Sequence, residues 1–424
     1  MKGKSKILLP GGFVKPGFEE VKQMFRENLA NGLEKGGSFA AYYQGELVVN
    51  IWGGEADSFC KSQWKEDTVS CFYSTTKSLS SVVIAHLVDR GCLKYEDVIC
   101  KYWPEFAQNG KENITLEQYV SNKAGLPGCE TPFDLSWLRD NPRKLGDILA
   151  EQKPLWTPGK YHGYHPMTFA LYLDQIVRRV DPKFRSLSKY FEEEIAKPFG
   201  LDLYIGLPKP LQYRCARIAA LNTYKQYTET MLDTFKGDIR VSNITSKNPR
   251  DWKHVNTMND TDFMDIPSGS AHGFGTAVAM AKFHSILANG GSLNGKQLLS
   301  ESLIQRFQKP LSWGVDLTYG MEDMYSLGAT VIPALEGKKV MYQFGHGGFG
   351  GQLALADCDY RVGWCYLTNH LNILSSVENP STINSMFLLN QGLYNCIHRL
   401  ENKVVSRQTF RSHEQLQKAI QSKL

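Results

Sequence analysis

The stretch Thr68-Val-Ser-Cys-Phe-Tyr-Ser-Thr-Thr-Lys77 passes from a short β-rich run into an apolar helical pattern that ends near Gly91. Within it, Ser74 and Lys77 have a spacing that places two residues on one face of a helix. A serine hydroxyl is a weak nucleophile, so it needs a proton acceptor and positive surroundings. The lysine ammonium and the positive end of the helix can supply the positive charge. The stretch therefore predicts an activated serine at the start of a long helix.

Three other serines have a lysine at the same spacing, namely Ser58, Ser62 and Ser186. The first two lie in a polar, lysine-rich connection, and Ser186 follows an Asp-Pro turn. Only Ser74 lies where a strand passes into a long apolar helix. This context selects Ser74 as the candidate nucleophile.

A second candidate group is Tyr164, which follows a Pro158-Gly159 turn and precedes a helical run that begins near Met167. A nearby ammonium lowers the pKa of a phenol, so a tyrosine here could accept the serine proton. Taken alone, the residue could also be a packed core tyrosine. Tyr119 belongs to a similar Tyr-x-Ser pattern, but it lies within an amphipathic helical stretch.

The third element is the glycine-rich run Phe344-Gly-His346-Gly347-Gly348-Phe349-Gly-Gly351, which lies between two strand-like segments. Glycines let backbone N–H groups approach a ligand, and a histidine at the head of the run can donate a hydrogen bond to a substrate oxygen. The run also matches a Gly-x-Gly-x-x-Gly dinucleotide pattern. That pattern requires a helix directly afterwards, whereas residues 352–357 alternate briefly as a strand does, so we do not expect a dinucleotide-binding fold.

Strand-like segments cluster near both ends of the chain. Residues 38–57 form two β-rich runs around a Gln-Gly pair, which predicts a hairpin, and further runs lie within residues 325–368. Helical periodicity dominates residues 74–287. We therefore expect an α/β fold of the α+β type. One antiparallel sheet is built from both ends of the chain and flanked by terminal helices over residues 18–33 and 382–399, with an inserted helical lobe.

These segments define one catalytic domain over residues 14–400. Its sheet lobe comprises residues 14–73 and 275–400, and its helical lobe comprises residues 74–274. A cleft is expected where the two lobes meet. Residues 401–424 are polar and are expected to form a C-terminal tail outside the domain.

The composition is that of a folded protein, since 42% of the 424 residues are hydrophobic and 21% are charged. The net charge of +5 is spread along the chain without Lys/Arg blocks, which argues against nucleic-acid binding. No apolar stretch approaches the roughly 20 residues of a membrane span. The apolar run Ile7–Leu9 is far shorter than the core of a secretion signal, so we do not expect secretion.

The nine cysteines are scattered and include no Cys-x-x-Cys pair, a pattern typical of a reducing compartment. His162 and His165 have a spacing that could suit a metal, but no His-Glu-x-x-His pattern accompanies them. We therefore expect no bound metal and no other cofactor.

The last three residues are Ser422-Lys423-Leu424, which match a peroxisomal import signal. The tripeptide predicts a peroxisomal protein that binds the import receptor. The alternative is a polar tail that ends in these residues by chance, in a cytoplasmic protein.

Taken together, Ser74-Thr-Thr-Lys77, Tyr164-His165 and His346-Gly-Gly348 follow one another in an order that resembles the serine β-lactamase and penicillin-binding-protein superfamily. The resemblance is strongest to its esterase-like branch related to class C β-lactamases, and it extends from about Gly17 to Arg399.

The resemblance implies specific roles for these residues. Ser74 would be the acylated nucleophile, Lys77 its charge partner and proton shuttle, and Tyr164 the general base. His346 would open the strand that lines the site, and the N–H groups of Ser74 and Phe349 would form the oxyanion hole. The residues implied to contact substrate are Gly347, Gly348, Phe349 and His165.

Two departures from the family pattern bear on the substrate. Class C β-lactamases carry an asparagine two positions after the tyrosine, where this chain has Pro166, and His-Gly-Gly replaces the Lys-Thr-Gly whose cation recognises a substrate carboxylate. The expected function is therefore a serine hydrolase, an esterase or acyltransferase that acts on a small neutral ester or thioester. The alternative is a catalytically silent member of the fold that serves as a binding or scaffold protein.

Overall fold

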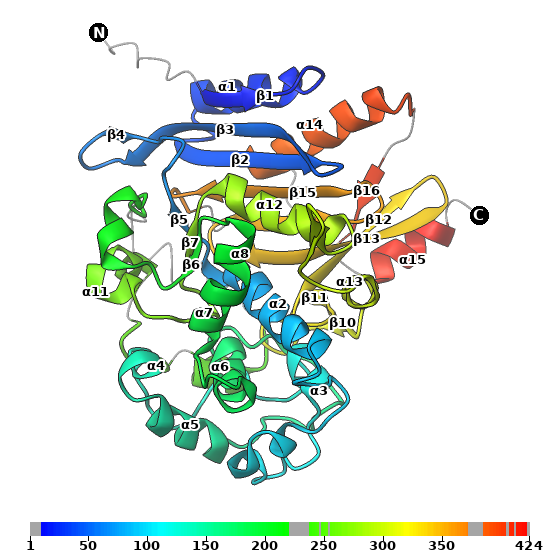
Figure 1. Cartoon of the computed structure of the whole chain (residues 1–424). Coiled ribbons are helices and arrows are strands. Elements are labelled where there is room, and N and C mark those ends of the chain that lie inside the picture. The colour runs from blue at the N-terminus through cyan, green and yellow to red at the C-terminus, as the bar shows by residue number, and fades with distance from the viewer. Residues whose placement is uncertain are drawn as a thin grey trace.

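The computed structural model describes residues 10–219, 237–245, 247–252, 255–371, 385–403, 407–410 and 413–421. Within these ranges the chain forms one large antiparallel sheet, helices on both faces of it, and a helical lobe (Figure 1). The predicted α+β architecture is confirmed.

The large sheet joins segments from both ends of the chain. Its strands, in spatial order, are β1 (Gly11–Val14), β3 (Glu46–Asp57), β2 (Gly36–Tyr43), β15 (Val362–Thr368), β14 (Gln352–Asp357), β13 (Lys339–Gly348), β12 (Thr330–Glu336), β11 (Glu322–Tyr325) and β10 (Ser312–Val315). Two short strands pair at its margins, β4 (Ser62–Gln63) with β3 and β16 (Arg407–Thr409) with β12. The predicted hairpin is β2–β3, and β2 pairs directly with β15.

The remaining elements surround this sheet. Two small sheets consist of β5 (Ser70–Cys71), β7 (Gly273–Gly275) and β6 (Leu203–Ile205), and of β8 (Ser292–Leu293) and β9 (Lys296–Gln297). The helices are α1 (Glu19–Asn31), α2 (Thr76–Asp89), α3 (Leu116–Val120), α4 (Trp137–Asp140), α5 (Pro142–Glu151), α6 (Thr168–Val180), α7 (Leu187–Tyr190), α8 (Lys197–Phe199), α10 (Ile239–Thr245), α11 (Thr261–Met264), α12 (Ala277–Ala288), α13 (Glu301–Phe307), α14 (Ser385–Leu400) and α15 (His413–Gln421). Tighter turns are η1 (Tyr73–Thr75), η2 (Ile99–Lys101), η3 (Pro104–Phe106), η5 (Lys209–Arg214) and η6 (Val255–Asn259), and η4 (Phe191–Ala196) is a π-helical turn.

Both faces of the sheet are covered, so strand residues are buried on either side. On one face, Phe39 packs in a cluster with residues of α1 and α14, while its neighbour Ala40 joins the core beneath α12 (Figure 1). Close contact with α12 depends on Gly363 of β15, because a Cβ there would lie 2.0 Å from the Ser285 nitrogen. Alternation along the strands therefore builds two cores with the sheet between them.

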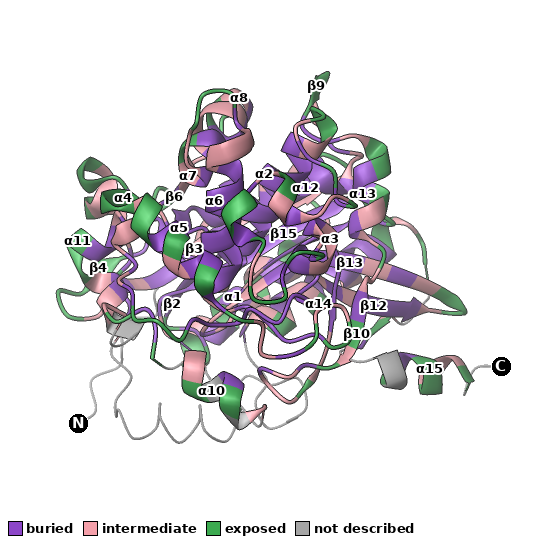
Figure 2. Ribbon diagram, turned by 90° about the horizontal axis from the view of Figure 1, so that it is seen from below, coloured by how far each residue is buried: buried purple, intermediate pink, exposed green. Residues whose placement is uncertain are grey.

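Helix α2 crosses the centre of the helical lobe. Every residue from Thr76 to Leu87 is buried, which is the pattern of a helix enclosed on all sides (Figure 2). Its neighbours include α6, whose apolar residues lie in the same core. The sequence prediction of a long buried helix after Ser74 is confirmed.

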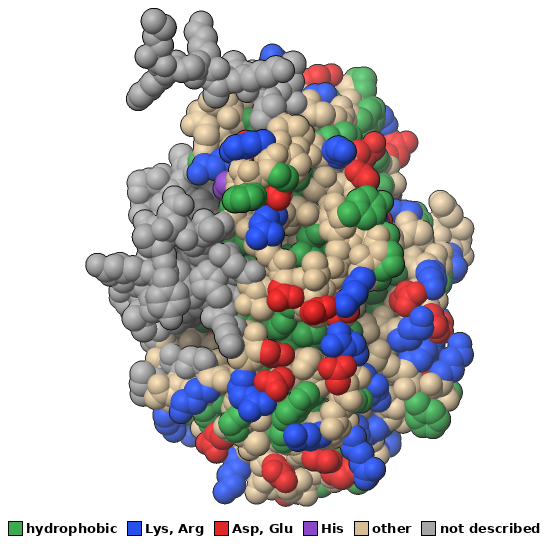
Figure 3. Space-filling model, turned by 90° about the vertical axis from the view of Figure 1, so that its left-hand side faces the viewer, with side chains coloured by type: hydrophobic (Ala, Val, Ile, Leu, Met, Phe, Trp, Pro, Cys, Tyr) green, Lys and Arg blue, Asp and Glu red, His purple; other side chains and the backbone are tan. Residues whose placement is uncertain are grey.

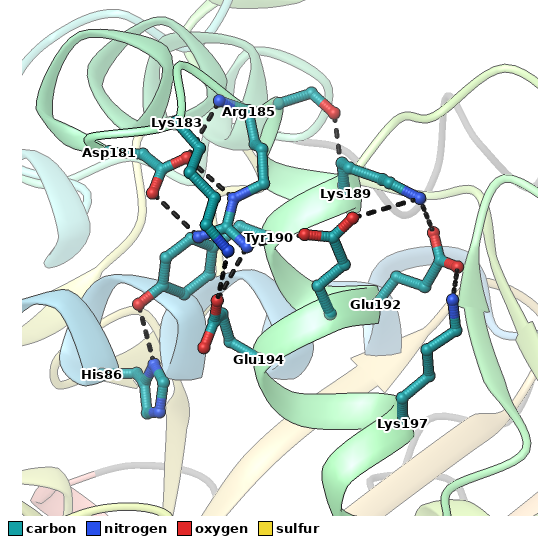
Figure 4. A network of polar contacts seen from close by, with 11 residues as sticks. His86, Asp181, Lys183, Arg185, Lys189, Tyr190, Glu192, Glu194 and Lys197 are labelled. Carbon is teal, nitrogen blue, oxygen red and sulfur yellow. Dashed lines mark hydrogen bonds and ion pairs between the residues drawn. The ribbon is translucent and has the colours of Figure 1, made fainter.

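A polar network holds the end of α6, α7 and η4 together (Figure 4). The Arg185 guanidinium contacts three carboxylates, at 2.8, 2.8 and 2.7 Å, from Asp181, Glu193 and Glu194. Beside it, the Tyr190 hydroxyl lies 2.9 Å from His86 Nδ1 of α2. The network therefore attaches the α7–η4 segment to the helix that carries Lys77.

The C-terminal residues differ from the predicted detached tail. Strand β11 pairs with β12 only at Thr330, at the start of that strand. Strand β16 pairs with the other end of β12, from Ala334 to Glu336. The Arg407 guanidinium contacts the buried Asp357 carboxylate at 2.6 Å, and Leu416 of α15 packs against Leu335. The boundary placed at residue 400 is thus wrong, because a few apolar and charged groups in this polar segment find buried partners. The sheet also begins at Gly11, before residue 14.

Some predictions fall on residues that are not described. Helix α14 matches the predicted helix 382–399 from Ser385 onward, and the residues before it lie outside the described ranges. The terminal Ser422-Lys423-Leu424 also lies outside them.

Among the described residues, no helix combines the length and the apolar character needed to cross a membrane. On the face shown in Figure 3, acidic and basic side chains are interspersed. This mixed surface agrees with the dilute net charge of the sequence.

Candidate active site

Ser74 lies in the tight turn η1 between β5 and α2. The preceding residue, Tyr73, has a left-handed φ of 49°, a conformation that bulky residues adopt rarely and that is enriched at functional sites. From Thr68 to Leu87 every residue is buried except Ser74, which is partly exposed. The predicted passage from strand to helix therefore presents one serine to solvent from an otherwise buried segment.

Lys77 approaches Ser74 as the spacing predicts. Its Nζ lies 3.1 Å from Ser74 Oγ, 2.7 Å from Pro166 O and 2.8 Å from Ser270 O. The side chain is 1% exposed, and burial lowers the pKa of Lys77 well below its ordinary value. The amine donates in all three contacts, to two carbonyl oxygens and to the serine oxygen.

Tyr164 lies on the other side of the amine, with Lys77 Nζ 4.9 Å from the centre of its ring. Burial raises the pKa of the Tyr164 phenol, and the neighbouring Ser74 hydroxyl acts in the opposite direction. The hydroxyl makes no well-formed hydrogen bond to the described residues. The phenol is therefore protonated at rest and has capacity left for a bond to a reacting group.

His346 of β13 packs against Tyr164, with 5.6 Å between the ring centres. Burial, with a contribution from Lys77, lowers the pKa of His346 to about 3, so the ring is neutral at physiological pH. Its Nδ1 lies 2.6 Å from Gly347 O and must donate there, since a carbonyl can only accept. The free Nε2 is then an acceptor, so the predicted donation from His346 to a substrate oxygen does not fit this tautomer.

The glycine run brings β13 against η1. A Cβ on Gly348 would lie 2.2 Å from Phe72 O and 2.8 Å from Thr75 Oγ1. The next residue after Gly348 is Phe349, whose ring packs edge-on against the Tyr73 ring, with 5.7 Å between the ring centres. The structure thus places Phe349 beside the nucleophile turn, and its role in an oxyanion hole stays a prediction.

His165 is fully buried and both its ring nitrogens have partners. Leu126 N donates to Nε2 at 2.9 Å, so Nδ1 is the donor to Asn122 Oδ1, also at 2.9 Å. Burial lowers the pKa of His165 to about 3. This geometry suits a residue that positions the turn 122–126 beside Tyr164, and the predicted contact with substrate remains a prediction.

Sequence reasoning missed Ser270, whose carbonyl binds Lys77. Its hydroxyl donates to Met167 O at 2.6 Å and accepts from Ala170 N at 2.9 Å, which joins this loop to the start of α6. The segment lies far from the motifs in sequence and carries no motif of its own. Only the long-range contact reveals its role.

The alternative motifs have structural roles. The Ser186 side chain caps α7 by accepting from Lys189 N, and the Tyr119 hydroxyl donates to Thr168 O and Phe169 O, each at 3.0 Å. In the described part of the chain, no three His, Cys, Asp or Glu side chains gather as a metal site.

A cavity of about 980 Å³ lies at the opposite end of α2, where Asp89 and Arg90 are among the lining residues. None of the eight candidate site residues lines it. A cleft at Ser74 itself stays a prediction, supported by the partial exposure of that residue.

Comparison with known proteins agrees with this geometry. The family model described as Beta-lactamase matches residues 21–380. The esterase/beta-lactamase LipL of Mycobacterium tuberculosis is 28% identical over 377 residues, which cover 85% of this chain and 83% of that protein. The crystal structure of a family VIII carboxylesterase has a TM-score of 0.79 and 29% identity, covering 91% of this chain and 99% of the other. EstA from Arthrobacter nitroguajacolicus Rue61a, at 24% identity and a TM-score of 0.76, shares the fold.

The fold and the Ser–Lys–Tyr cluster define a serine hydrolase. The chain belongs to the β-lactamase family, as the matched range across most of its length shows.

The two neighbouring glycines of β13 give a matched test of the close packing at the site. Gly348→Ala should lower the free energy of unfolding by about 1–3 kcal/mol, because its Cβ would press on backbone and on a buried threonine. Gly347→Ala should have a much smaller effect, since its nearest neighbour would lie at 3.8 Å. Denaturant unfolding of both variants measures this, and equal losses would contradict the proposed contact.

Proposed function

We propose that the protein is an esterase that forms an acyl-Ser74 intermediate on a small, neutral ester or thioester. The observation that carries the proposal is the approach of a fully buried amine to the one partly exposed serine of its segment, at 3.1 Å. The names of two relatives, an esterase/beta-lactamase and a family VIII carboxylesterase, support the same chemistry.

The cluster suits two successive acyl transfers. In the first, Ser74 Oγ attacks the ester carbonyl and its proton passes to the neutral form of the Lys77 amine, whose nitrogen lies 3.1 Å from Oγ and whose charged form burial disfavours. Tyr164 then delivers a proton to the departing alcohol or thiol and recovers one from Lys77, which lies against its ring. In the second, the same groups take a proton from the water that attacks the acyl carbon and return it to Ser74 Oγ, as the bond from Oγ to the acyl carbon breaks and the acid is released.

A neutral substrate fits the charges around Ser74. His346 replaces the usual cation on β13 and is neutral at physiological pH, since its pKa is about 3. Burial also disfavours the charged form of Lys77. A carboxylate next to these groups would lose its hydration without gaining a fixed positive partner.

We expect this charge pattern to appear as substrate preference. With p-nitrophenyl butyrate and the p-nitrophenyl ester of succinate, which carries a free carboxylate, kcat/KM should favour the neutral ester by at least about 10-fold. Steady-state kinetics at low ionic strength measures the ratio. Equal rates, or a preference for the acid, would contradict a neutral site.

The nucleophile can be tested against a matched serine. Ser74→Ala should abolish labelling by a fluorophosphonate probe and reduce ester hydrolysis at least about 1000-fold, because the acyl acceptor is lost. Ser62→Ala, which alters an exposed Ser-x-x-Lys elsewhere, should keep both activities. Undiminished labelling of the Ser74 variant would remove the proposal, and a wild-type protein that resists every such probe would favour the scaffold alternative.

We further propose that, where Leu424 is the last residue, the Ser-Lys-Leu terminus directs the protein to peroxisomes through the import receptor. The terminal position of the tripeptide supports this proposal. An N-terminally labelled chain should colocalise with a peroxisomal marker, and removal of Leu424 should leave it in the cytoplasm. Equal distribution of the two forms would contradict the signal.

A further inference from the structure

One short turn, Asp316 to Thr318, holds the main chain of Tyr164 from both sides. Tyr164 N donates to Asp316 Oδ2 at 2.7 Å, and the Thr318 hydroxyl donates to Tyr164 O at 2.8 Å. Two residues before the tyrosine, Leu317 N donates to His162 O at 3.1 Å. The backbone on which the phenol is mounted is therefore fixed by a segment more than a hundred residues further along the chain.

The Asp316 carboxylate is fully buried and accepts four hydrogen bonds. Oδ1 accepts from Thr318 N at 2.8 Å and Tyr319 N at 3.1 Å, while Oδ2 accepts from Tyr164 N and, at 3.0 Å, from the Tyr325 hydroxyl. The three backbone N–H groups can only donate, which suits an ionised carboxylate. The single hydrogen of the Tyr325 hydroxyl is shared with Asp323 Oδ2, also at 3.0 Å. Burial raises the pKa of Asp316, and the neighbouring His162 and the backbone donors oppose this rise.

Two residues that follow this turn, Tyr319 directly after it and Tyr325 at the end of β11, pack against the phenol ring. Tyr319 lies 5.0 Å and Tyr325 lies 6.2 Å from the Tyr164 ring, measured between centres, and Tyr325 is stacked almost parallel to it. His346 and the Lys77 amine lie against the ring as well. Main chain and ring are thus both confined, so the position of the hydroxyl relative to Ser74 depends on this turn.

We propose that Asp316 is a positioning residue of the acyl-transfer reaction, which holds Tyr164 in place and sets the electrostatic field at the Lys77–Tyr164 pair. The inference rests on the proposed esterase function and extends it to a residue that touches no substrate. Misplacement of a catalytic group by about 1 Å can cost about 100-fold in rate, so the hydrogen bonds to the Tyr164 main chain bear directly on turnover.

The charged and titratable groups around the phenol determine whether loss of the Asp316 charge raises or lowers the pKa of Tyr164. Asp316 and Asp323 each raise the pKa of Tyr164, whereas contact with Ser74 lowers it. Lys77, His346, Tyr319 and Tyr325 pack against the ring, and His162 faces Asp316. Removal of the Asp316 charge therefore lowers the pH at which the Lys77–Tyr164 pair releases its proton.

The test compares Asp316→Asn and Asp316→Glu with wild type. The readouts are kcat, KM and the rate of fluorophosphonate labelling at Ser74, between about pH 5 and about pH 10. Asp316→Asn should lower kcat about 100-fold with KM nearly unchanged, and should shift the acidic limb of kcat/KM to lower pH because it removes the charge. Asp316→Glu keeps the charge but displaces it, so it should lose kcat while the limb stays near its wild-type position.

Asp174→Asn is the matched control, since Asp174 is also a buried carboxylate that accepts a backbone N–H, from Leu187 at 2.8 Å, in the helical lobe. The Asp174→Asn variant should have a lower free energy of unfolding, while the acidic limb of its kcat/KM profile should stay at the wild-type pH. Should Asp316→Asn fail to fold, Thr318→Val, which removes only the hydroxyl bound to Tyr164 O, should lower kcat about 10-fold.

The possible outcomes separate the two proposals. If wild-type protein labels at Ser74 and folded Asp316→Asn keeps the wild-type kcat, or loses activity equally at all pH values with an unmoved limb, the positioning role is wrong and the esterase function stands. If wild-type protein neither labels at Ser74 nor hydrolyses esters, the esterase function itself is wrong, and Asp316 then only stabilises the turn.

Discussion

The burial of one amine is the constraint on which the site depends. Lys77 lies on a helix that is enclosed on every side, and an amine removed from water is stable only if its hydrogens find partners. Those partners are the carbonyls of Pro166 and Ser270, contributed by segments about one hundred and two hundred residues away in sequence, and the Ser74 hydroxyl. The lobe must therefore fold around the amine. Burial in the lobe lowers the pKa of Lys77, and the contact with Ser74 directs the amine at the nucleophile.

The large sheet contributes the remaining residues of the site. Strand β13 reaches η1 closely enough that Gly348 leaves no space for a side chain, which brings His346 and Phe349 beside Tyr164 and Ser74. At the two positions where the sequence departs from the family pattern, Pro166 contributes its main-chain carbonyl to Lys77, and His346 supplies a neutral ring. The His346 ring is thus neutral at physiological pH, and burial disfavours the charged form of Lys77.

Much of the fold could be predicted because its signals are local. The hairpin β2–β3, the strands β12 to β15 and the buried helix α2 follow from alternation and helical periodicity over a few turns of chain. The C-terminal segment was predicted wrongly, since its polar composition hides Arg407 and Leu416, whose buried partners lie elsewhere in the chain. The hydrogen-bond direction of His346 was also wrong, because it depends on which atom faces the neighbouring carbonyl. For His165 the structure shows partners for both ring nitrogens, and its contact with substrate stays a prediction.

The sequence by itself determined which serine lies at the start of a helix, which lysine lies one turn beyond it, and the order of the motifs. Each of these depends only on spacing along the chain. Only the tertiary structure decided how these groups behave. The charge of Lys77 and His346 depends on burial, and the placement of Tyr164 depends on Asp316, a residue that no local pattern marks. Burial and long-range hydrogen bonds arise from segments that meet only after folding, so the chemistry of the site becomes visible only there.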